Sequence, residues 1–562
     1  MTATSDRTVA AGNQHSIRAA VSRYARVGLS RLLRTSPPST TYRVHRGVPI
    51  PMRDGVDLVA DHYWPDTAEP VGTLLVRGPY GRRWPFSALY ASAYATRGYH
   101  VVLQSVRGTF GSGGTFEPAV NEADDGADTA AWLRDQPWFT GSFGTVGASY
   151  LGLTQWAQLQ DPPPELAASV IVVGLHDFAA GVWGSGSFGT SDFLGWSHMV
   201  AHQEDPIGPR WLINRLRAGR RVTNAAGKVP LGAAGRQILG DRSPWWESWV
   251  EHSDSADEFW DRYRFTKALA TSRVPVLLIG GWQDLFLEQT VQQFRALRDR
   301  GVDVAMTLGP WTHSQLATKG APLVLRESLQ WFGAHVAGGP ATPRSRVRVF
   351  VTGGGGWTGL PDWPPTTTGE VRHLGTDGQL SRRPDPDAAV QSSFTFDPHD
   401  PTPTIGGRLL SSGSGIRRDD RLAERSDVLV FTGEALTADL FVFGAPVVEL
   451  AHDSDTPHVD LFVRVSEVDV KGRSHNVSDG YLRMQPDRET CSVRIELDSI
   501  AHRFAAGSRI RLTIGGGSFP RYARNLGTGE SVLEGARSMP ATHVIAHRGS
   551  RLTLPSRTSL PG

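Results

Sequence analysis

Short, mostly apolar runs recur through the first two thirds of the chain, and segments with a helical pattern separate them. The runs are GTLLVRG (72–78), YHVVLQS (99–105), LAASVIVV (166–173), VPVLLIGGW (274–282) and VDVAMTLGPW (302–311). A strand that is buried on both faces is apolar throughout its length, whereas a half-exposed strand alternates. Such runs separated by helices therefore predict a parallel sheet covered on both faces, which is an α/β fold.

Two other sequence patterns occur: one interrupts the alternation of strands and helices, and one follows it. Between residues 181 and 270 the segments FGTSDFLGWSHMVAHQ, RWLINRLRAGRRV and PWWESWVEHSDSADEFWDRYRF have the pattern of Trp-rich helices, with no strand between them. From about Arg346 onward, beginning with RVRVFVTGGGGW, apolar and polar residues alternate between turn signals, which is typical of a β-sandwich of jelly-roll type. The predicted organisation is a basic N-terminal arm (1–40), an α/β core in two parts (41–180 and 271–344), an inserted helical cap (181–270) and a C-terminal β-domain (345–562).

Composition excludes several classes of protein. A formal charge of +2 favours neither nucleic acid nor an acidic partner, and the single cysteine, Cys491, rules out an internal disulfide framework. No apolar run has the length of a signal-peptide core or a membrane span, so we expect a cytoplasmic protein without a stable membrane anchor. The basic segment 17–34 predicts an amphipathic helix that packs on the protein or frays; it could also touch a membrane surface or a second copy in a homo-oligomer.

Ser149 lies where an apolar strand is followed by a helical pattern, in the sequence FGTVGASYLGL. A nucleophile elbow places its serine on such a turn and needs small residues around it, because the strained backbone passes close to its neighbours. Gly147 fits the G-x-S-x-G pattern, but Leu151 stands where the second glycine belongs and Gly152 follows one residue later. On this stretch alone, Ser149 could equally be a serine in a glycine-rich loop.

Two further residues complete a catalytic set. Asp284 follows the strand VPVLLIGG, and His313 follows VDVAMTLG, so both lie at the carboxyl ends of predicted strands and in the chain order nucleophile, acid, base. Taken singly, Asp284 could be a helix N-cap and His313 a surface histidine. Their coincidence with an elbow-like serine favours catalysis.

Motifs over three domains resemble the CocE/NonD hydrolases, which include cocaine esterases, α-amino acid ester hydrolases, glutaryl acylases and X-Pro dipeptidyl peptidases. They are MRDGVDLVADHYWP, VRGPYG, GASYLGLTQW, GGWQDLF, GPWTHS, DVLVFTGEALTADL, SDGYLR and HRFAAGSRIRLTIGGGSFPRYARN. The resemblance covers residues from about 43 to the end and implies an α/β-hydrolase core with a helical cap and a jelly roll. The family's serine motif is G-x-S-Y-x-G, so the displaced glycine is the family's own form.

The resemblance also implies roles for individual residues. Ser149 would attack an ester or amide carbonyl, with His313 as base and Asp284 as its orienter. The oxyanion hole would consist of the Tyr80 hydroxyl and the backbone N–H of Tyr150. Without the resemblance, Tyr80 could simply be a loop aromatic packed on the sheet. No metal or organic cofactor is expected, because the chain has no HExxH, Cys/His cluster, P-loop or Rossmann glycine motif.

Substrate class is less constrained. Leu285, Phe286 and Leu287 follow Asp284, where the family's amino-ester hydrolases carry carboxylates for a substrate ammonium. We therefore expect an apolar or aromatic acyl group on a small ester substrate, walled by Trp196 and Trp183, although both tryptophans could instead be cap core. An amide-cleaving acylase or X-Pro-type peptidase, an acyltransferase, and a non-catalytic binding protein on a hydrolase scaffold remain alternatives.

Overall fold

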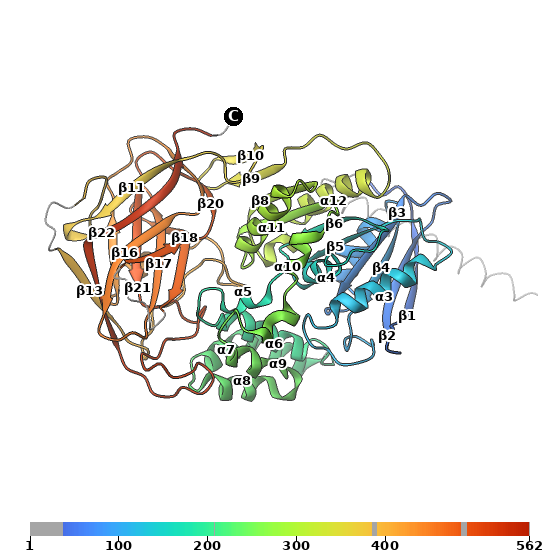
Figure 1. The fold of residues 1–562 in the computed structure, drawn as a ribbon, viewed down its shortest axis with the longest axis horizontal. Helices are drawn as coiled ribbons and strands as arrows, with labels where there is room; N and C mark the ends of the chain where they lie inside the picture. Colours follow the sequence, from blue (N-terminus) through green and yellow to red (C-terminus); the bar gives the residue numbers. More distant parts are fainter. Residues whose placement is uncertain (1–36, 207, 385–389, 485–491, 561–562) are drawn as a thin grey trace, which may run out of the picture.

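The computed structural model describes residues 37–206, 208–384, 390–484 and 492–560. The helix predicted over 17–34 and Cys491 lie outside these ranges. Figure 1 shows an α/β core on one side, an all-β domain on the other, and a group of helices beneath the junction. No helix in the described ranges has the length and apolar character needed to cross a membrane.

The core is built on a ten-stranded sheet in the order β1-β2-β4-β3-β5-β6-β7-β8-β9-β10. Strands β3 to β9 run parallel, while β1, β2 and β10 are antiparallel additions at the edges. The strands are β1 (Tyr42–Pro51), β2 (Asp57–Pro65), β3 (Gly72–Gly78), β4 (Tyr99–Ser105), β5 (Phe143–Ala148), β6 (Leu166–Val172), β7 (Val276–Gln283), β8 (Val304–Thr312), β9 (Val347–Val351) and β10 (Gly356–Leu360). The predicted parallel sheet is confirmed.

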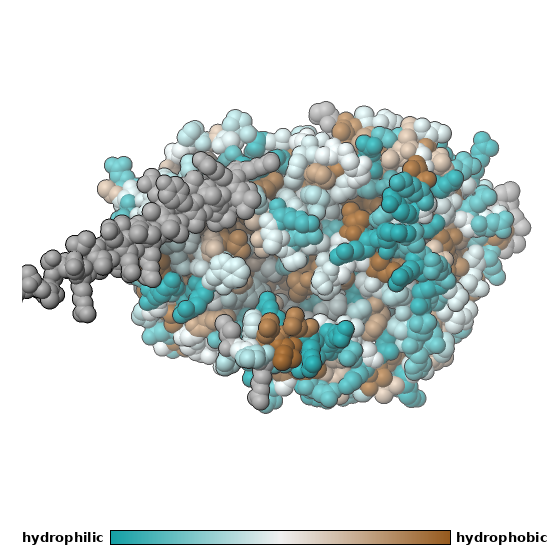
Figure 2. All heavy atoms as spheres, turned by 180° about the vertical axis from the view of Figure 1, so that it is seen from behind, coloured by the Kyte–Doolittle hydropathy of each residue, from teal (hydrophilic) through white to brown (hydrophobic). Residues whose placement is uncertain are grey.

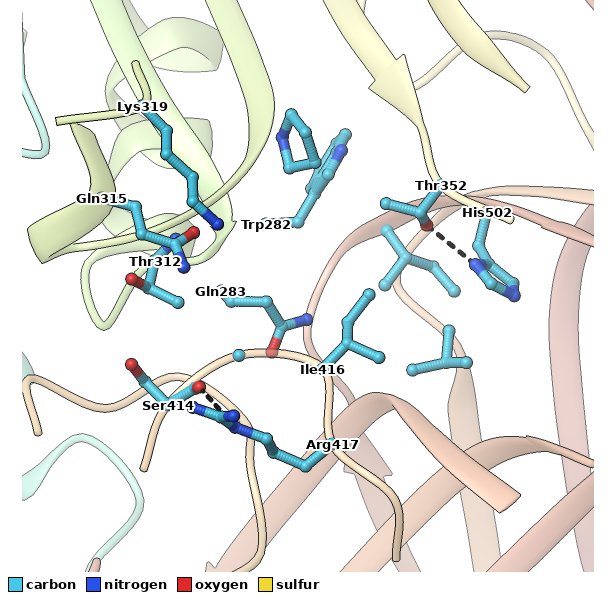
Figure 3. A pocket seen from close by; sticks show the side chains of 14 residues that line it. Trp282, Gln283, Thr312, Gln315, Lys319, Thr352, Ser414, Ile416, Arg417 and His502 are labelled. Atoms are coloured by element: carbon cyan, nitrogen blue, oxygen red, sulfur yellow. Dashed lines mark hydrogen bonds between the residues drawn. The ribbon is translucent and has the colours of Figure 1, made fainter. Parts of the chain in front are cut away.

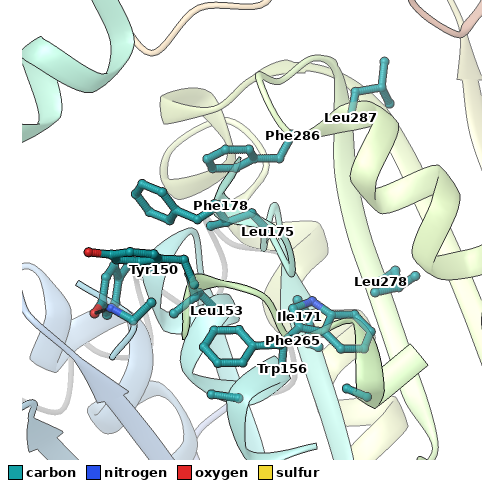
Figure 4. Close-up of a cluster of buried hydrophobic side chains, with 14 of the residues drawn as sticks. Tyr150, Leu153, Trp156, Ile171, Leu175, Phe178, Phe265, Leu278, Phe286 and Leu287 are labelled. Carbon is teal, nitrogen blue, oxygen red and sulfur yellow. Dashed lines mark hydrogen bonds between the residues drawn. The ribbon is translucent and has the colours of Figure 1, made fainter. Parts of the chain in front are cut away.

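Both faces of this sheet are covered at its centre, which explains why the central strands β3 to β8 are mostly apolar. Ile171 and Leu278 point into one hydrophobic cluster, where Leu153 and Trp156 of α4 meet them (Figure 4). Their neighbour Val170 points into a second cluster on the opposite face. Helices α3 (Glu122–Arg134), α4 (Tyr150–Gln158) and α11 (Leu287–Asp299) cover the first face, and η1 (Ser87–Ser92), α2 (Ala93–Ala95) and α12 (Ala321–His335) cover the second.

A run of helices interrupts the sheet between β6 and β7. They are α5 (Phe178–Trp183), α6 (Thr190–His202), α7 (Pro209–Ala226), α8 (Leu231–Leu239), η2 (Gly240–Arg242), α9 (Trp245–Glu251), η3 (Glu258–Tyr263) and α10 (Thr266–Thr271). They form the helical cap predicted from the sequence. Apolar surface remains on it: Leu212, Ile213 and Leu216 of α7 are about half to three quarters exposed, and Figure 2 shows a brown patch at the lower centre of the molecule.

The C-terminal domain is a sandwich of two antiparallel sheets that share one hydrophobic core. The four-stranded sheet has the order β14-β21-β17-β18, and the long strand β22 is central to the larger sheet. The strands are β11 (Thr368–Leu374), β12 (Leu380–Ser381), β13 (Gln391–Phe396), β14 (Val428–Thr432), β15 (Leu440–Gly444), β16 (Val447–Ser454), β17 (Asp460–Val468), β18 (Ser474–Arg483), β19 (Ser492–Glu496), β20 (Ile500–Phe504), β21 (Arg509–Gly515) and β22 (Ala541–Arg557).

One strand assignment needs correction. The segment RVRVFVTGGGGW, which we assigned to the β-sandwich, instead supplies β9 and the start of β10 at the edge of the core sheet. Val347 and Val349 of β9 pair with Met306 and Leu308 of β8 in parallel. Strand β9 lies next to the edge strand β10 and has one half-buried face, so it alternates in the same way as a sandwich strand and the pattern alone does not distinguish them.

Candidate active site

Ser149 occupies a strained turn between β5 and α4. Its backbone has φ 60° and ψ −121°, a conformation that costs a non-glycine residue about 1–3 kcal/mol. The two neighbouring glycines make the turn possible. A Cβ on Gly147 would lie 2.3 Å from Leu151 Cβ, and one on Gly152 would lie 2.7 Å from the Gly174 Cα. The small residues around Ser149 are thus required by backbone contacts, as an elbow demands.

A buried polar network fixes Tyr150, the residue that follows Ser149 in the elbow. The Tyr150 hydroxyl donates to Glu122 Oε1 over 2.9 Å and accepts from the backbone N–H of Ala119 over 2.8 Å. Arg77 Nη2 lies 3.1 Å from Glu122 Oε2, and Arg77 also donates to the Glu122 backbone carbonyl. Burial raises the pKa of Glu122. Because removing one partner of a buried ion pair leaves the other uncompensated, this network holds Tyr150 and α4 firmly in place.

Asp284 and His313 come together at the ends of β7 and β8. Asp284 Oδ1 lies 2.6 Å from His313 Nδ1, and Asp284 is fully buried. Asp284 Oδ2 accepts from the backbone N–H of Phe286 over 3.1 Å, which fixes the carboxylate. The Phe286 ring meets the imidazole edge-on with a centroid distance of 5.6 Å. A carboxylate on Nδ1 orients the ring so that Nε2 is the nitrogen available to a reactant.

Ser149 and His313 line one small cavity of about 30 Å³. Its other walls come from the elbow, the cap, the loop after Asp284 and the β-domain: Tyr150, Leu175, Phe178, Asp192, Phe193, Trp196, Leu285, Phe286 and Leu410. The structure thus brings the serine and the Asp284–His313 pair to a common, mostly apolar space. Sequence reasoning did not identify the contribution of Leu410, which lies far along the chain in the β-domain.

Tyr80, in the loop after β3, is not among the residues that line this cavity, but it is bonded to Trp196, which is. Its hydroxyl accepts a hydrogen bond of 3.0 Å from Trp196 Nε1 and lies near the Ser149 side chain. Burial raises the pKa of Tyr80 to about 12, so the phenol keeps its proton at neutral pH. Since Trp196 occupies an acceptor lone pair of this oxygen, the phenolic proton remains for donation to another acceptor. Trp196 therefore has a polar role in addition to the apolar one predicted for it.

The two other residues predicted at the site differ in their placement. Tyr150 is the first residue of α4, so its N–H is among those that a helix leaves without an intrahelical acceptor. Trp183 is 2% exposed in the cap core, donates from Nε1 to the Trp249 carbonyl over 2.7 Å, and is not among the residues that line the cavity. The expectation that Trp183 walls the acyl pocket is corrected, since its indole is committed to packing within the cap.

Asp192 is a carboxylate that sequence reasoning missed. It lies on α6, is 7% exposed and lines the cavity. Its Oδ1 accepts from the backbone N–H of Leu410 over 2.8 Å, and burial raises its pKa, opposed in part by that bond and by Arg521 and His313. The available sequence signal was Asp192 itself, a charged residue directly before the mostly apolar helical segment FLGWSHM.

Within the described ranges, no three His, Cys, Asp or Glu side chains are gathered as metal ligands would be. The catalytic set predicted from the sequence consists of a hydroxyl, an imidazole, a carboxylate and a phenol. These groups are sufficient for acyl transfer by a serine nucleophile.

Comparison with known proteins matches both the α/β core and the β-domain to family models. Residues 54–315 match the family model of the X-Pro dipeptidyl-peptidase (S15 family), and residues 340–553 match that of the X-Pro dipeptidyl-peptidase C-terminal non-catalytic domain. The chain is 30% identical to the cocaine esterase of Rhodococcus sp. (strain MB1 Bresler), over 92% of this chain and 98% of that protein.

Solved structures share the complete architecture. An aminopeptidase from the marine sediment archaeon Thaumarchaeota archaeon superposes with a TM-score of 0.79 at 23% identity, over 93% of this chain and 98% of that one. An α-amino acid ester hydrolase superposes with a TM-score of 0.78 at 22% identity, over the same shares of the two chains. These similarities establish the fold.

Proposed function

Because the chain belongs to the CocE/NonD family of serine hydrolases, we propose that it cleaves carboxylic esters of apolar acyl groups through an acyl-enzyme on Ser149. The observation that carries the proposal is the shared cavity: a strained serine and a carboxylate-bound histidine line it, and a protonated phenol lies near the serine.

The reaction follows from these groups. His313 Nε2 accepts the proton of Ser149 Oγ as that oxygen bonds to the substrate carbonyl carbon. Asp284 holds the imidazole through Nδ1 and stabilises its positive charge. The imidazolium then gives its proton to the leaving alcohol, the C–O bond breaks, and the acyl group stays on Ser149. In the second half of the reaction the same imidazole deprotonates a water molecule, whose oxygen bonds to the acyl carbon. The bond to Ser149 Oγ then breaks, the imidazolium returns its proton to Oγ, and the acid leaves.

Negative charge on the carbonyl oxygen needs donors that are already in place. The Tyr80 hydroxyl and the Tyr150 N–H are the two donors in this proposal, and preorganised donors of this kind contribute about 10²–10³ each to kcat. Trp196 is a positioning residue here, because it holds the Tyr80 oxygen through Nε1. The Arg77–Glu122 pair holds Tyr150 from the other side.

The size and lining of the cavity support a small apolar acyl group. Its walls are mainly Leu and Phe side chains, and its volume of about 30 Å³ matches a group the size of a single water or methyl. The methyl of an acetyl group therefore matches this space in size. A phenylacetyl group is larger than the space.

The test compares esters with amides of the same acyl groups. Wild type and Ser149→Ala are assayed with p-nitrophenyl acetate, butyrate and phenylacetate, and with the matching p-nitroanilides. We expect wild type to cleave the esters faster than the anilides, to favour acetate, and to lose activity on replacement of Ser149. Equal release by the two proteins would reject the proposal and favour a binding protein, whereas faster anilide cleavage would favour the acylase or peptidase alternative.

Asp192 supports a second candidate function, in which the acyl group carries an amine. A carboxylate in an apolar pocket would pair with a substrate ammonium at short range, where the surroundings strengthen the attraction. Methyl alaninate and methyl propionate differ by that amine alone. A preference for methyl alaninate in wild type that disappears in Asp192→Asn would establish this candidate, and no preference would leave the apolar substrate.

A further inference from the structure

A second cavity, larger than the one that contains Ser149, lies between the α/β core and the β-domain (Figure 3). It measures about 320 Å³. Gln283 and Thr312, the residues immediately before Asp284 and His313, line it from the core side. It therefore lies against the same two loops as the candidate triad but has a separate lining. Its volume is within the range of sites for small organic ligands, about 300–1,000 Å³.

The charged groups of this cavity have one sign. Lys319 and Arg417 line it from opposite domains, and no Asp or Glu is among its lining residues. Arg417 donates to the backbone carbonyls of Ser414 and Ser412, so its charge is not neutralised by these partners. Within the part of the chain that the structure describes, no carboxylate forms an ion pair with Lys319. Two cations without acidic neighbours favour an anion between them.

A buried amide lies beside the cations. Gln283 is 8% exposed, and its Oε1 has no hydrogen-bond partner in the structure. That oxygen has almost no accessible surface, so a molecule in the cavity would meet other atoms of this side chain. In Figure 3 the Gln283 side chain extends into the space between Lys319, Thr312 and Arg417.

Apolar surface completes the cavity. The Trp282 ring and the Ile416 side chain line it, and Trp282 Nε1 already donates to the Phe350 carbonyl over 2.7 Å. Trp282 thus presents only carbon to a ligand. A fitting molecule has a carboxylate for the two cations and a small apolar body for Trp282 and Ile416.

We propose that this interdomain cavity, lined by Lys319, Arg417 and Trp282, is a binding site for a small carboxylate with an apolar body, distinct from the acyl pocket. The proposal does not rest on the role of Ser149. Its test is a binding measurement without turnover, so its failure and that of the proposed hydrolysis are distinguishable.

The experiment is calorimetric titration of the full chain with mandelate, phenylacetate and benzyl alcohol. Phenylacetate lacks the hydroxyl of mandelate, and benzyl alcohol lacks its carboxylate. We expect both carboxylates to bind more tightly than benzyl alcohol. Lys319→Gln should weaken mandelate about tenfold or more, the value of a lost charge-assisted hydrogen bond.

Two further variants keep the test decisive. Arg417→Gln should weaken mandelate similarly, and Lys267→Gln, which removes an exposed charge on α10 away from the cavity, should leave it unchanged. Thermal unfolding of each variant verifies its fold, and Lys319→Gln alone suffices if Arg417→Gln unfolds. Undetectable binding, equal affinity for benzyl alcohol, or equal mandelate affinity in wild type and Lys319→Gln would overturn the proposal and leave a water-filled gap or binding in the acyl pocket.

Discussion

Replacing Tyr80 by Phe removes one oxygen from the candidate active site and leaves the ring in place. In the structure that oxygen accepts from Trp196 Nε1 over 3.0 Å and lies near the Ser149 side chain. Because burial raises the pKa of Tyr80 to about 12, the group that is lost at neutral pH is a neutral proton donor. The Tyr150 N–H remains as the second donor of the proposed oxyanion hole.

The Tyr80 hydroxyl is proposed to act mainly in the transition state, and this sets the expected loss of kcat. Removing one oxyanion donor costs about 10²–10³ in kcat, or about 2.7–4 kcal/mol in the transition state. The substrate's neutral carbonyl gains less from the donor than the oxyanion does, so KM should change little and kcat/KM should fall with kcat. Trp196 Nε1 also loses its acceptor, which lowers the free energy of unfolding by about 1–3 kcal/mol.

The assay is steady-state hydrolysis of p-nitrophenyl acetate, with denaturant unfolding of the same samples. Tyr94→Phe is the matched control, because Tyr94 is also buried and also loses one hydroxyl contact, to Ser328 Oγ at 2.8 Å, on the opposite face of the sheet. We expect Tyr94→Phe to retain kcat. A Tyr80→Phe enzyme with kcat within about threefold of wild type would refute the assignment of this donor, since even the weakest donors cost more.

Two further predictions concern stability. Gly152→Ala should unfold at a lower urea concentration and lose esterase activity, because its Cβ would lie 2.7 Å from the Gly174 Cα. Gly219→Ala on α7, where a Cβ meets nothing within 4 Å, should raise the free energy of unfolding by about 0.5–1 kcal/mol. The reverse order of the two urea midpoints would contradict this account. His62 and His543 are buried with pKa values lowered to about 3, mainly by burial, so below pH 6.5 the unfolded chain takes up protons that the folded chain refuses. The contribution of each imidazole to the free energy of unfolding is complete above pH 6.5 and falls by about 2 kcal/mol by pH 5. An unfolding free energy that stays constant between pH 7 and pH 5 would show that these imidazoles are not held neutral.

The order of the candidate catalytic residues could be predicted because each follows a strand with a strong local signal. Ser149, Asp284 and His313 come directly after the mostly apolar strands β5, β7 and β8, and the carboxyl ends of parallel strands gather at one edge of a sheet. The geometry between Asp284 and His313 then depends on the neighbouring strands β7 and β8, whose register the structure supplies.

Residues whose placement depends on packing between domains could not be predicted. Asp192 faces the acyl pocket because Leu410, far along the chain, binds its carboxylate through a backbone N–H. Trp183 and Trp196 have similar sequence contexts, yet Trp183 donates within the cap and Trp196 donates to Tyr80. Helical periodicity gives the buried face of a helix but not which buried space that face adjoins.

The cavity lined by Lys319 and Arg417 had no sequence signal for the same reason. Its lining comes from segments of the core and of the β-domain that carry no motif individually, and only their docking places two cations without carboxylate neighbours beside Gln283. The misassigned strand β9 is a related case, because an alternating strand can belong to either sheet.

The most direct test of the catalytic assignment is intact-mass spectrometry after brief exposure to p-nitrophenyl acetate, with Ser149→Ala run beside wild type. We expect a transient gain of one acetyl group in wild type, mapped by peptide fragmentation to Ser149, and none in the variant. An adduct of equal abundance in the variant, or turnover by wild type with the acetyl group on another residue, would contradict the assignment of Ser149 as the nucleophile.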